Sequence, residues 1–92
     1  MLPRGWRQAR FERPHKKYVF HSFNGRYRAH LLEENFLVHY GKIEISASVY
    51  RITRREDVLM GVYNDVGRSQ VEANVHKNRL FAIISRSYYE RI

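Results

Sequence analysis

The chain alternates apolar and polar residues most regularly between Ile43 and Ile52. On an extended strand these residues would divide between two faces: Ile43, Ile45, Ala47 and Val49 on one, and Glu44, Ser46, Ser48 and Tyr50 on the other. A period of two over so long a stretch is typical of a strand with one buried face. We therefore expect Ile43–Ile52 to be a central strand of an antiparallel sheet.

A hairpin is predicted on the N-terminal side of this strand. Residues 18–23 and 26–32 both have strand character, and the Asn24-Gly25 pair between them tolerates the positive φ of a two-residue turn. In the second strand one face would carry Tyr27, Ala29 and Leu31, and the other Arg26, Arg28 and His30. A two-residue loop would also set His21 directly across from Arg28.

Two shorter stretches are predicted to be strands as well. Residues 36–40 resume the alternation and end at the Gly41-Lys42 turn. Residues 58–64 form another strand candidate, in which Gly61 indicates a bulge or a close backbone approach.

The last third of the chain fits two interpretations. Residues 70–76 alternate through three apolar residues and 80–85 are strongly apolar, which favours strands. Against this, Ser69 and Glu72 have the spacing of a helix-capping box, and Val71, Val75 and Ala82 would share one side of a helix. Strands are the favoured prediction here, with a helix as the alternative.

These elements define the expected fold class. Ninety-two residues with 43% hydrophobic side chains suffice for one small domain. We predict an all-β protein: a small antiparallel barrel or sandwich of five to seven short strands, whose closure hides the sheet edges. The alternative is an α+β fold, an antiparallel sheet with one C-terminal helix.

The first 17 residues are predicted to be a basic arm in front of a single β domain at 18–92. Pro3 and Pro14 punctuate the segment, and its apolar residues show no strand alternation. Its six basic residues stand against one acidic residue: Arg4, Arg7, Arg10, Arg13, Lys16 and Lys17 against Glu12. This segment therefore carries most of the net charge of +8.

A strongly basic chain rich in arginine favours a polyanionic partner. Trp6 and Phe11 in the arm could stack on exposed bases, and Tyr50 on the polar face of its strand could do the same. We expect a non-catalytic module of low sequence specificity that binds the nucleic-acid backbone. The candidate binding residues are Arg4, Trp6, Arg7, Arg10, Phe11, Arg13, Lys16, Lys17, Arg26, Arg28 and Tyr50.

Two other functions remain open from the sequence. The first is a small structural or inhibitory protein of a virus, phage or ribonucleoprotein assembly, with a protein as its partner and Trp6 as an anchor. The second is a small basic ribonuclease, in which His30 or His39 would act with Glu33, Glu44 and Arg28. The sequence does not predict an oligomeric state.

Several kinds of site are not expected. The chain has no cysteine, so disulfides, thiolate metal sites and cysteine nucleophiles are excluded. It contains no phosphate loop, zinc-ligand series or dinucleotide fingerprint, and we expect neither a cofactor nor a metal. It also lacks an apolar run of the length of a signal peptide or membrane span. We therefore expect an intracellular protein, cytoplasmic or within a virus or phage particle, with no membrane partner.

Overall fold

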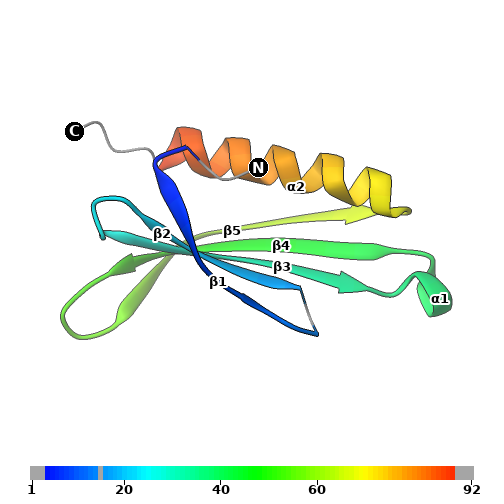
Figure 1. Ribbon diagram of the computed structural model, residues 1–92, viewed down its shortest axis with the longest axis horizontal. Helices are drawn as coiled ribbons and strands as arrows, with labels where there is room; N and C mark the ends of the chain where they lie inside the picture. Colours follow the sequence, from blue (N-terminus) through cyan, green and yellow to red (C-terminus); the bar gives the residue numbers. More distant parts are fainter. Residues whose placement is uncertain (1–3, 15, 89–92) are drawn as a thin grey trace.

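The computed structural model describes residues 4–14 and 16–88 and shows an antiparallel sheet with a long helix across one face (Figure 1). The elements in chain order are β1 (Trp6–Glu12), β2 (Lys17–Ser22), β3 (Tyr27–Asn35), α1 (Leu37–Tyr40), β4 (Ile43–Ile52), β5 (Asp57–Gly67) and α2 (Gln70–Ser87). The strands pair in the order β1-β2-β3-β4-β5, each antiparallel to the next. The predicted strand Ile43–Ile52 is confirmed as β4, which pairs on both sides.

The sheet is open, with β1 and β5 at its edges. The predicted barrel or sandwich is therefore wrong, and the alternative of an antiparallel sheet with one C-terminal helix is confirmed. The physical reason is that α2 shields the apolar face of the sheet, so the face is buried without closure or a second sheet.

The two faces of the sheet differ in what covers them. We call the side beneath α2 the covered face and the opposite side the open face. On the covered face, β3 and β4 contribute Ala29, Leu31, Ile43, Ile45, Ala47 and Val49, which pack against α2 through Ala73, Leu80, Phe81 and Ile84. The open face carries the polar half of the alternation, so most charged side chains of the strands point away from the core, although Glu33 of β3 is buried on the covered face.

The β2–β3 hairpin has the predicted register, with His21 paired to Arg28. Asn24 supports the turn because its side-chain oxygen accepts hydrogen bonds from the Ser22 hydroxyl, at 2.8 Å, and from the Arg26 amide, at 3.0 Å. Gly25 has a φ of 74°, the left-handed conformation that the Asn-Gly signal predicts. Of the two alternatives predicted at Gly61, a bulge is present beside it, because the β4–β5 register steps from Val49↔Gly61 to Tyr50↔Leu59 and leaves Met60 as the extra residue.

The strands favoured for residues 70–76 and 80–85 are wrong, because this segment is the 18-residue helix α2. Ser69 caps the helix by accepting a hydrogen bond from the Glu72 amide at 3.2 Å, as in the capping-box alternative. The buried side differs from the one expected: Val71 and Val75 are exposed, and the buried residues are Ala73, Leu80, Phe81 and Ile84. Lys77 lies between Ala73 and Leu80 on the same side of the helix, so the sequence does not show a continuous apolar stripe.

The structure also differs from the predicted arm, since residues 6–12 form the edge strand β1. Trp6 is buried in the core, with its ring 6.3 Å from that of Tyr27. A register shift between Gln8 and Arg10 adds a residue to the strand. Arg7 and Arg10 therefore lie on the same face although they are three residues apart, and the sequence shows no regular alternation. Residues 36–40, predicted as a strand, contain the short helix α1, which ends at Gly41 with a φ of 64°.

Candidate nucleic-acid interface

The strand register gathers basic side chains from three strands on the open face. One row across the sheet runs Arg7, His21, Arg28 and Tyr50 from β1 to β4. The next row contains Arg10, Val19 and His30, and Lys17 follows in the row beyond. We call the set Arg7, Arg10, Lys17, His21, Arg28 and His30 the cationic band. Five residues of the predicted set, four in the band and Tyr50, therefore share one surface.

The side chains of the band influence one another electrostatically. Burial lowers the pKa of His21 below its ordinary value, and the charges of Arg28, Arg7 and Arg10 lower it further. Burial also lowers the pKa of His30, with additional lowering by Lys17, Arg28 and Arg10. Both imidazoles are consequently neutral at pH 7 and sit in a positive field that would attract a phosphate.

The band is packed as well as charged. Val19, between Arg10 and His30 in the register, is only 2% exposed, so the longer side chains around it cover it. The ring of His30 lies 5.2 Å from that of Tyr50, centroid to centroid. Tyr50 also pairs with Arg28 in the strand register, so its ring borders the band, an arrangement that suits a base next to its phosphate.

Three ion pairs partly neutralise the positive charge of the cationic band. Arg28 Nη1 lies 2.5 Å from Asp57 Oδ2, Arg10 Nε lies 2.8 Å from Glu12 Oε1, and Lys17 Nζ lies 3.9 Å from Glu12 Oε2. These side chains are partly exposed, so each pair contributes little to stability and can exchange its carboxylate for a phosphate.

The charge of the open face changes sign along the strands. Two rows beyond His30, Glu34 of β3 pairs with Glu44 of β4. A hollow of about 300 Å³ lies at this acidic end, lined partly by the two glutamates. A polyanion on this face would be attracted to the cationic band and repelled from the hollow. The two ends of the open face are therefore expected to differ in their affinity for a polyanion.

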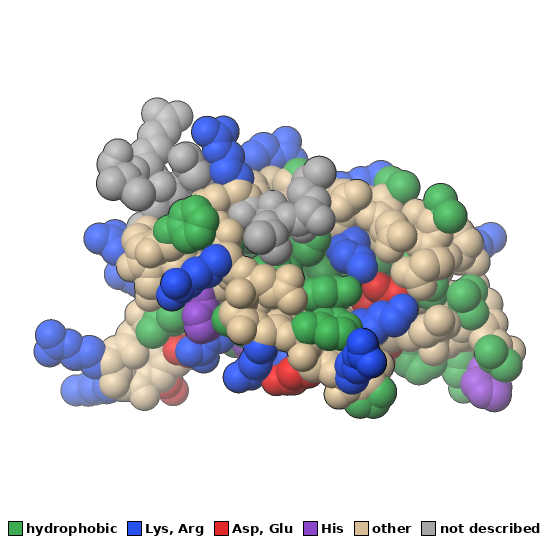
Figure 2. All heavy atoms as spheres, viewed as in Figure 1, with side chains coloured by type: hydrophobic (Ala, Val, Ile, Leu, Met, Phe, Trp, Pro, Cys, Tyr) green, Lys and Arg blue, Asp and Glu red, His purple; other side chains and the backbone are tan. Residues whose placement is uncertain are grey.

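More positive charge lies beyond the band, at the end of the sheet that holds the β2–β3 and β4–β5 turns. Arg26, Arg54 and Arg55 are exposed there. Figure 2 shows Lys and Arg side chains projecting from the left end, where Figure 1 places the β4–β5 turn. The end nearest the Arg7 row is therefore the most basic part of the open face.

The other predicted residues are not part of the band. Trp6 is buried at 2% exposure, so it cannot stack on a base as the sequence suggested. Phe11 packs against Tyr18 with the two ring centroids 4.6 Å apart. The remaining basic residues lie elsewhere: the Arg4 amide bonds to Ser85 of α2, Arg13 is exposed between β1 and β2, Lys16 contacts Glu33, and Arg26 is in the β2–β3 turn.

The residues considered for ribonuclease chemistry are not brought together. Glu33 lies on the covered face, where it contacts Lys77 at 3.1 Å, and His39 is exposed on α1. His30 and Arg28 lie on the open face, with Glu44 beyond them toward the acidic end. Within the part of the chain that the structure describes, no group of three His, Asp or Glu side chains could hold a metal ion.

The sequence prediction missed that β1 belongs to this surface. The signal for β1 was the alternation of Trp6 and Gln8 with Arg7, which the register shift before Arg10 interrupts. The predicted hairpin register is confirmed for His21 and His30, which lie on the same face as Arg28.

Comparison of the chain with protein-family models, with curated proteins and with solved structures finds no match. Neither α1 nor α2, the helices of the described residues, is both long and apolar enough to cross a membrane.

Proposed function

We propose that the protein binds nucleic acid through the cationic band, chiefly by contacts to phosphates and with low sequence specificity. The observation that carries this proposal is the convergence of four cationic side chains and two imidazoles from β1, β2 and β3 on a face that α2 does not cover. Arg7 and Arg10 are exposed and can reach a backbone that crosses the strands. Tyr50 at the border of the band would stack on a base, which adds affinity without reading sequence.

Because phosphate contacts release counterions, the affinity should fall steeply with salt. The test is fluorescence anisotropy with labelled single-stranded and double-stranded DNA and RNA over a range of salt concentrations. We expect the double variant Arg7→Gln/Arg10→Gln to weaken binding to all sequences alike. It should also reduce the slope of log K against log salt by about two.

The matched control is Arg79→Gln/Arg86→Gln, which removes two exposed arginines from α2 on the other side of the sheet. This control should leave the slope unchanged, because its arginines lie away from the band. Equal losses in the two double variants would show that net charge alone matters and would contradict the proposal. Absence of binding at low salt would reject it and favour a protein partner.

A further inference from the structure

The cationic band covers only part of the width of the open face. The strand register continues the rows of the band across β4 and β5. There the rows end in six uncharged side chains, paired as Tyr50 with Leu59, Ser48 with Val62, and Ser46 with Asn64. We call these six residues the uncharged strip. Leu59 and Val62 are 53% and 50% exposed, so the strip is a surface and not an extension of the core.

The bulge in β5 leaves Leu59 on the open face. The β4–β5 register steps at this point so that Leu59 pairs with Tyr50, which belongs to the open face. Asp57 lies two residues before Leu59, and its carboxylate binds Arg28 of the cationic band. Because residues two apart on a strand share a face, the Asp57–Arg28 contact shows that Leu59 faces the same side.

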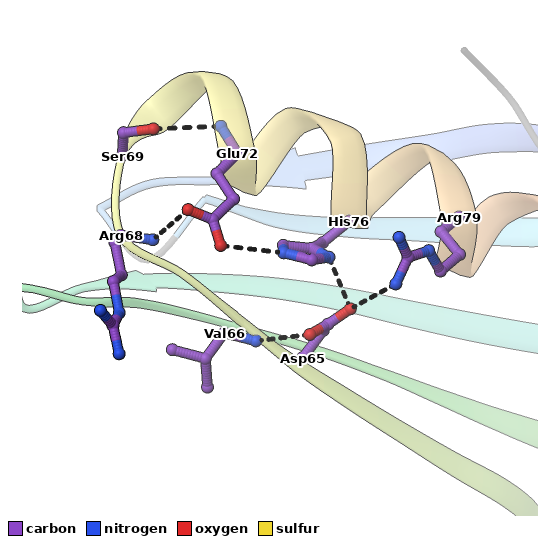
Figure 3. A network of polar contacts seen from close by, with 7 residues as sticks. All are labelled: Asp65, Val66, Arg68, Ser69, Glu72, His76 and Arg79. Carbon is purple, nitrogen blue, oxygen red and sulfur yellow. Dashed lines mark hydrogen bonds and ion pairs between the residues drawn. The ribbon is translucent and has the colours of Figure 1, made fainter.

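The two acidic residues of β5 do not add negative charge to the strip. Figure 3 shows Asp65 turned toward α2, where its Oδ2 lies 2.7 Å from His76 Nδ1 and 3.7 Å from Arg79 Nη1. Asp65 pairs with Ile45 on the covered face of the sheet. Asp57 lies beyond the strip and is paired with Arg28. A polyanion bound to the band therefore meets no carboxylate on these six residues.

Each row joins at least one cation to an uncharged pair. The three rows run from Arg7 and Arg28 to Tyr50 and Leu59, from Arg10 to Ser48 and Val62, and from Lys17 to Ser46 and Asn64. Neighbouring rows lie two residues apart along the strands, or about 7 Å, which resembles the separation of phosphates in an extended single strand. The next row carries Glu34 and Glu44 and ends the series.

We propose that the ligand of the open face is a single-stranded nucleic acid that lies along the strands, with its phosphates over the cationic band and its bases over the uncharged strip. This inference rests on the proposed function and adds the strandedness and orientation of the ligand. From β3 to β5 the sheet is two strand spacings wide, about 10 Å, which accommodates a nucleotide from phosphate to base. Tyr50 and Leu59 would contact the flat faces of bases, and the hydroxyl and amide groups of the strip can bond to base edges.

A duplex fits this surface less well. Its bases are stacked inside and the phosphates of both strands lie outside, so a duplex on the band would offer the uncharged strip no base face. Any phosphate placed over Leu59 or Val62 would lose hydration without gaining a cation. A single strand presents phosphates on one side and exposed aromatic rings on the other, which matches the two halves of the open face.

Fluorescence anisotropy with three labelled DNA probes of equal length tests this inference. The probes are a single strand of mixed sequence, its blunt-ended duplex, and an abasic strand that keeps the phosphates but has no bases. We expect the single strand to bind at least about tenfold more tightly than either other probe. Tyr50→Ala should weaken single-strand binding at least about fivefold, while Tyr50→Phe, which keeps the ring, should bind as the wild type does. Neither variant should change the salt slope, because no cation is removed.

The matched control is Tyr40→Ala, because Tyr40 is 72% exposed but lies on α1, outside the three rows. This control should bind all three probes as the wild type does. Equal affinity of the wild type for the three probes would overturn the inference, and so would full single-strand binding by Tyr50→Ala. The proposed function would survive either result if Arg7→Gln/Arg10→Gln still weakened binding. Absence of binding to every probe at low salt would overturn both. The comparison of probes needs only the wild type, so it decides the inference even if a Tyr50 variant does not fold.

Discussion

Replacing Lys77 with alanine is expected to destabilise the protein by about 3–5 kcal/mol, because it leaves the buried carboxylate of Glu33 without its main cation. Glu33 is 2% exposed, and its Oε2 lies 3.1 Å from Lys77 Nζ. Gln70 donates a hydrogen bond of 2.9 Å to Oε1, and Lys16 lies 3.5 Å from the same atom. The measurement is urea denaturation followed by circular dichroism.

The matched control for Lys77→Ala is Lys42→Ala. Lys42 pairs with Glu44 at 2.7 Å, but both side chains are well exposed, so the loss should be below about 1 kcal/mol. In Glu33→Leu/Lys77→Leu both charges are removed, and most of the lost stability should return. An equal effect of the two single variants would show that Glu33 is effectively solvated.

The carboxylate of Glu33 should also make the free energy of unfolding depend on pH in the acid range. Burial by itself raises the pKa of Glu33, but hydrogen bonds from Gln70 and Lys77 and the charges of Lys77 and Lys16 lower it below its ordinary value of 4.5. Because the folded pKa is the lower one, its stabilising contribution is complete above about pH 4.5 and is lost as the pH falls further. In Glu33→Gln, the free energy of unfolding from urea denaturation should therefore fall less steeply as the pH is lowered below about 4.5.

Gly67→Ala is expected to cost about 2–3 kcal/mol by forcing α2 away from the sheet. A Cβ atom at Gly67 would lie 2.7 Å from the Ala73 backbone nitrogen and 2.9 Å from the Ala73 Cα. These are main-chain atoms of the helix and cannot rotate away as a side chain would. Urea denaturation gives the loss in stability, and faster hydrogen exchange in α2 would locate the disturbance.

Gly41→Ala separates this steric effect from the conformational cost of replacing glycine. Gly41 has a positive φ but nothing within 4 Å of an added Cβ, so the variant should lose about 1 kcal/mol without disturbing α2. If Gly67→Ala costs no more than Gly41→Ala, the close contact between β5 and α2 is not as tight as the structure shows.

Local patterns in the sequence predict the middle of the sheet well. The alternation of β4 and the Asn24-Gly25 turn depend on adjacent residues alone, and both the strand and the His21–Arg28 register are as expected. The hairpin signals also place His21, Arg28 and His30 on one surface. That Tyr50 lies beside Arg28 depends on the β3–β4 pairing, which no local signal predicts. Part of the candidate interface was therefore predictable from local signals.

The sequence predictions were wrong where the order of apolar and polar residues depends on tertiary contacts. Lys77 occupies the buried stripe of α2 because Glu33 of β3 binds it there, and the sequence cannot show that pairing. The register shift before Arg10 breaks the period of β1, so a strand was taken for an arm. Trp6 was consequently assigned to base stacking although the fold places it in the core.

The most direct test of the proposed function is an NMR titration of isotope-labelled protein with a short oligonucleotide at low salt. It would follow the backbone amides, the arginine Nε–Hε groups and the histidine ring signals. We predict that the largest changes occur at Arg7, Arg10, Arg28, His21 and His30, and that the exposed side of α2 and the acidic end near Glu34 change little. Changes confined to α2, or no changes under conditions where the oligonucleotide binds, would contradict the assignment of the cationic band as the binding surface.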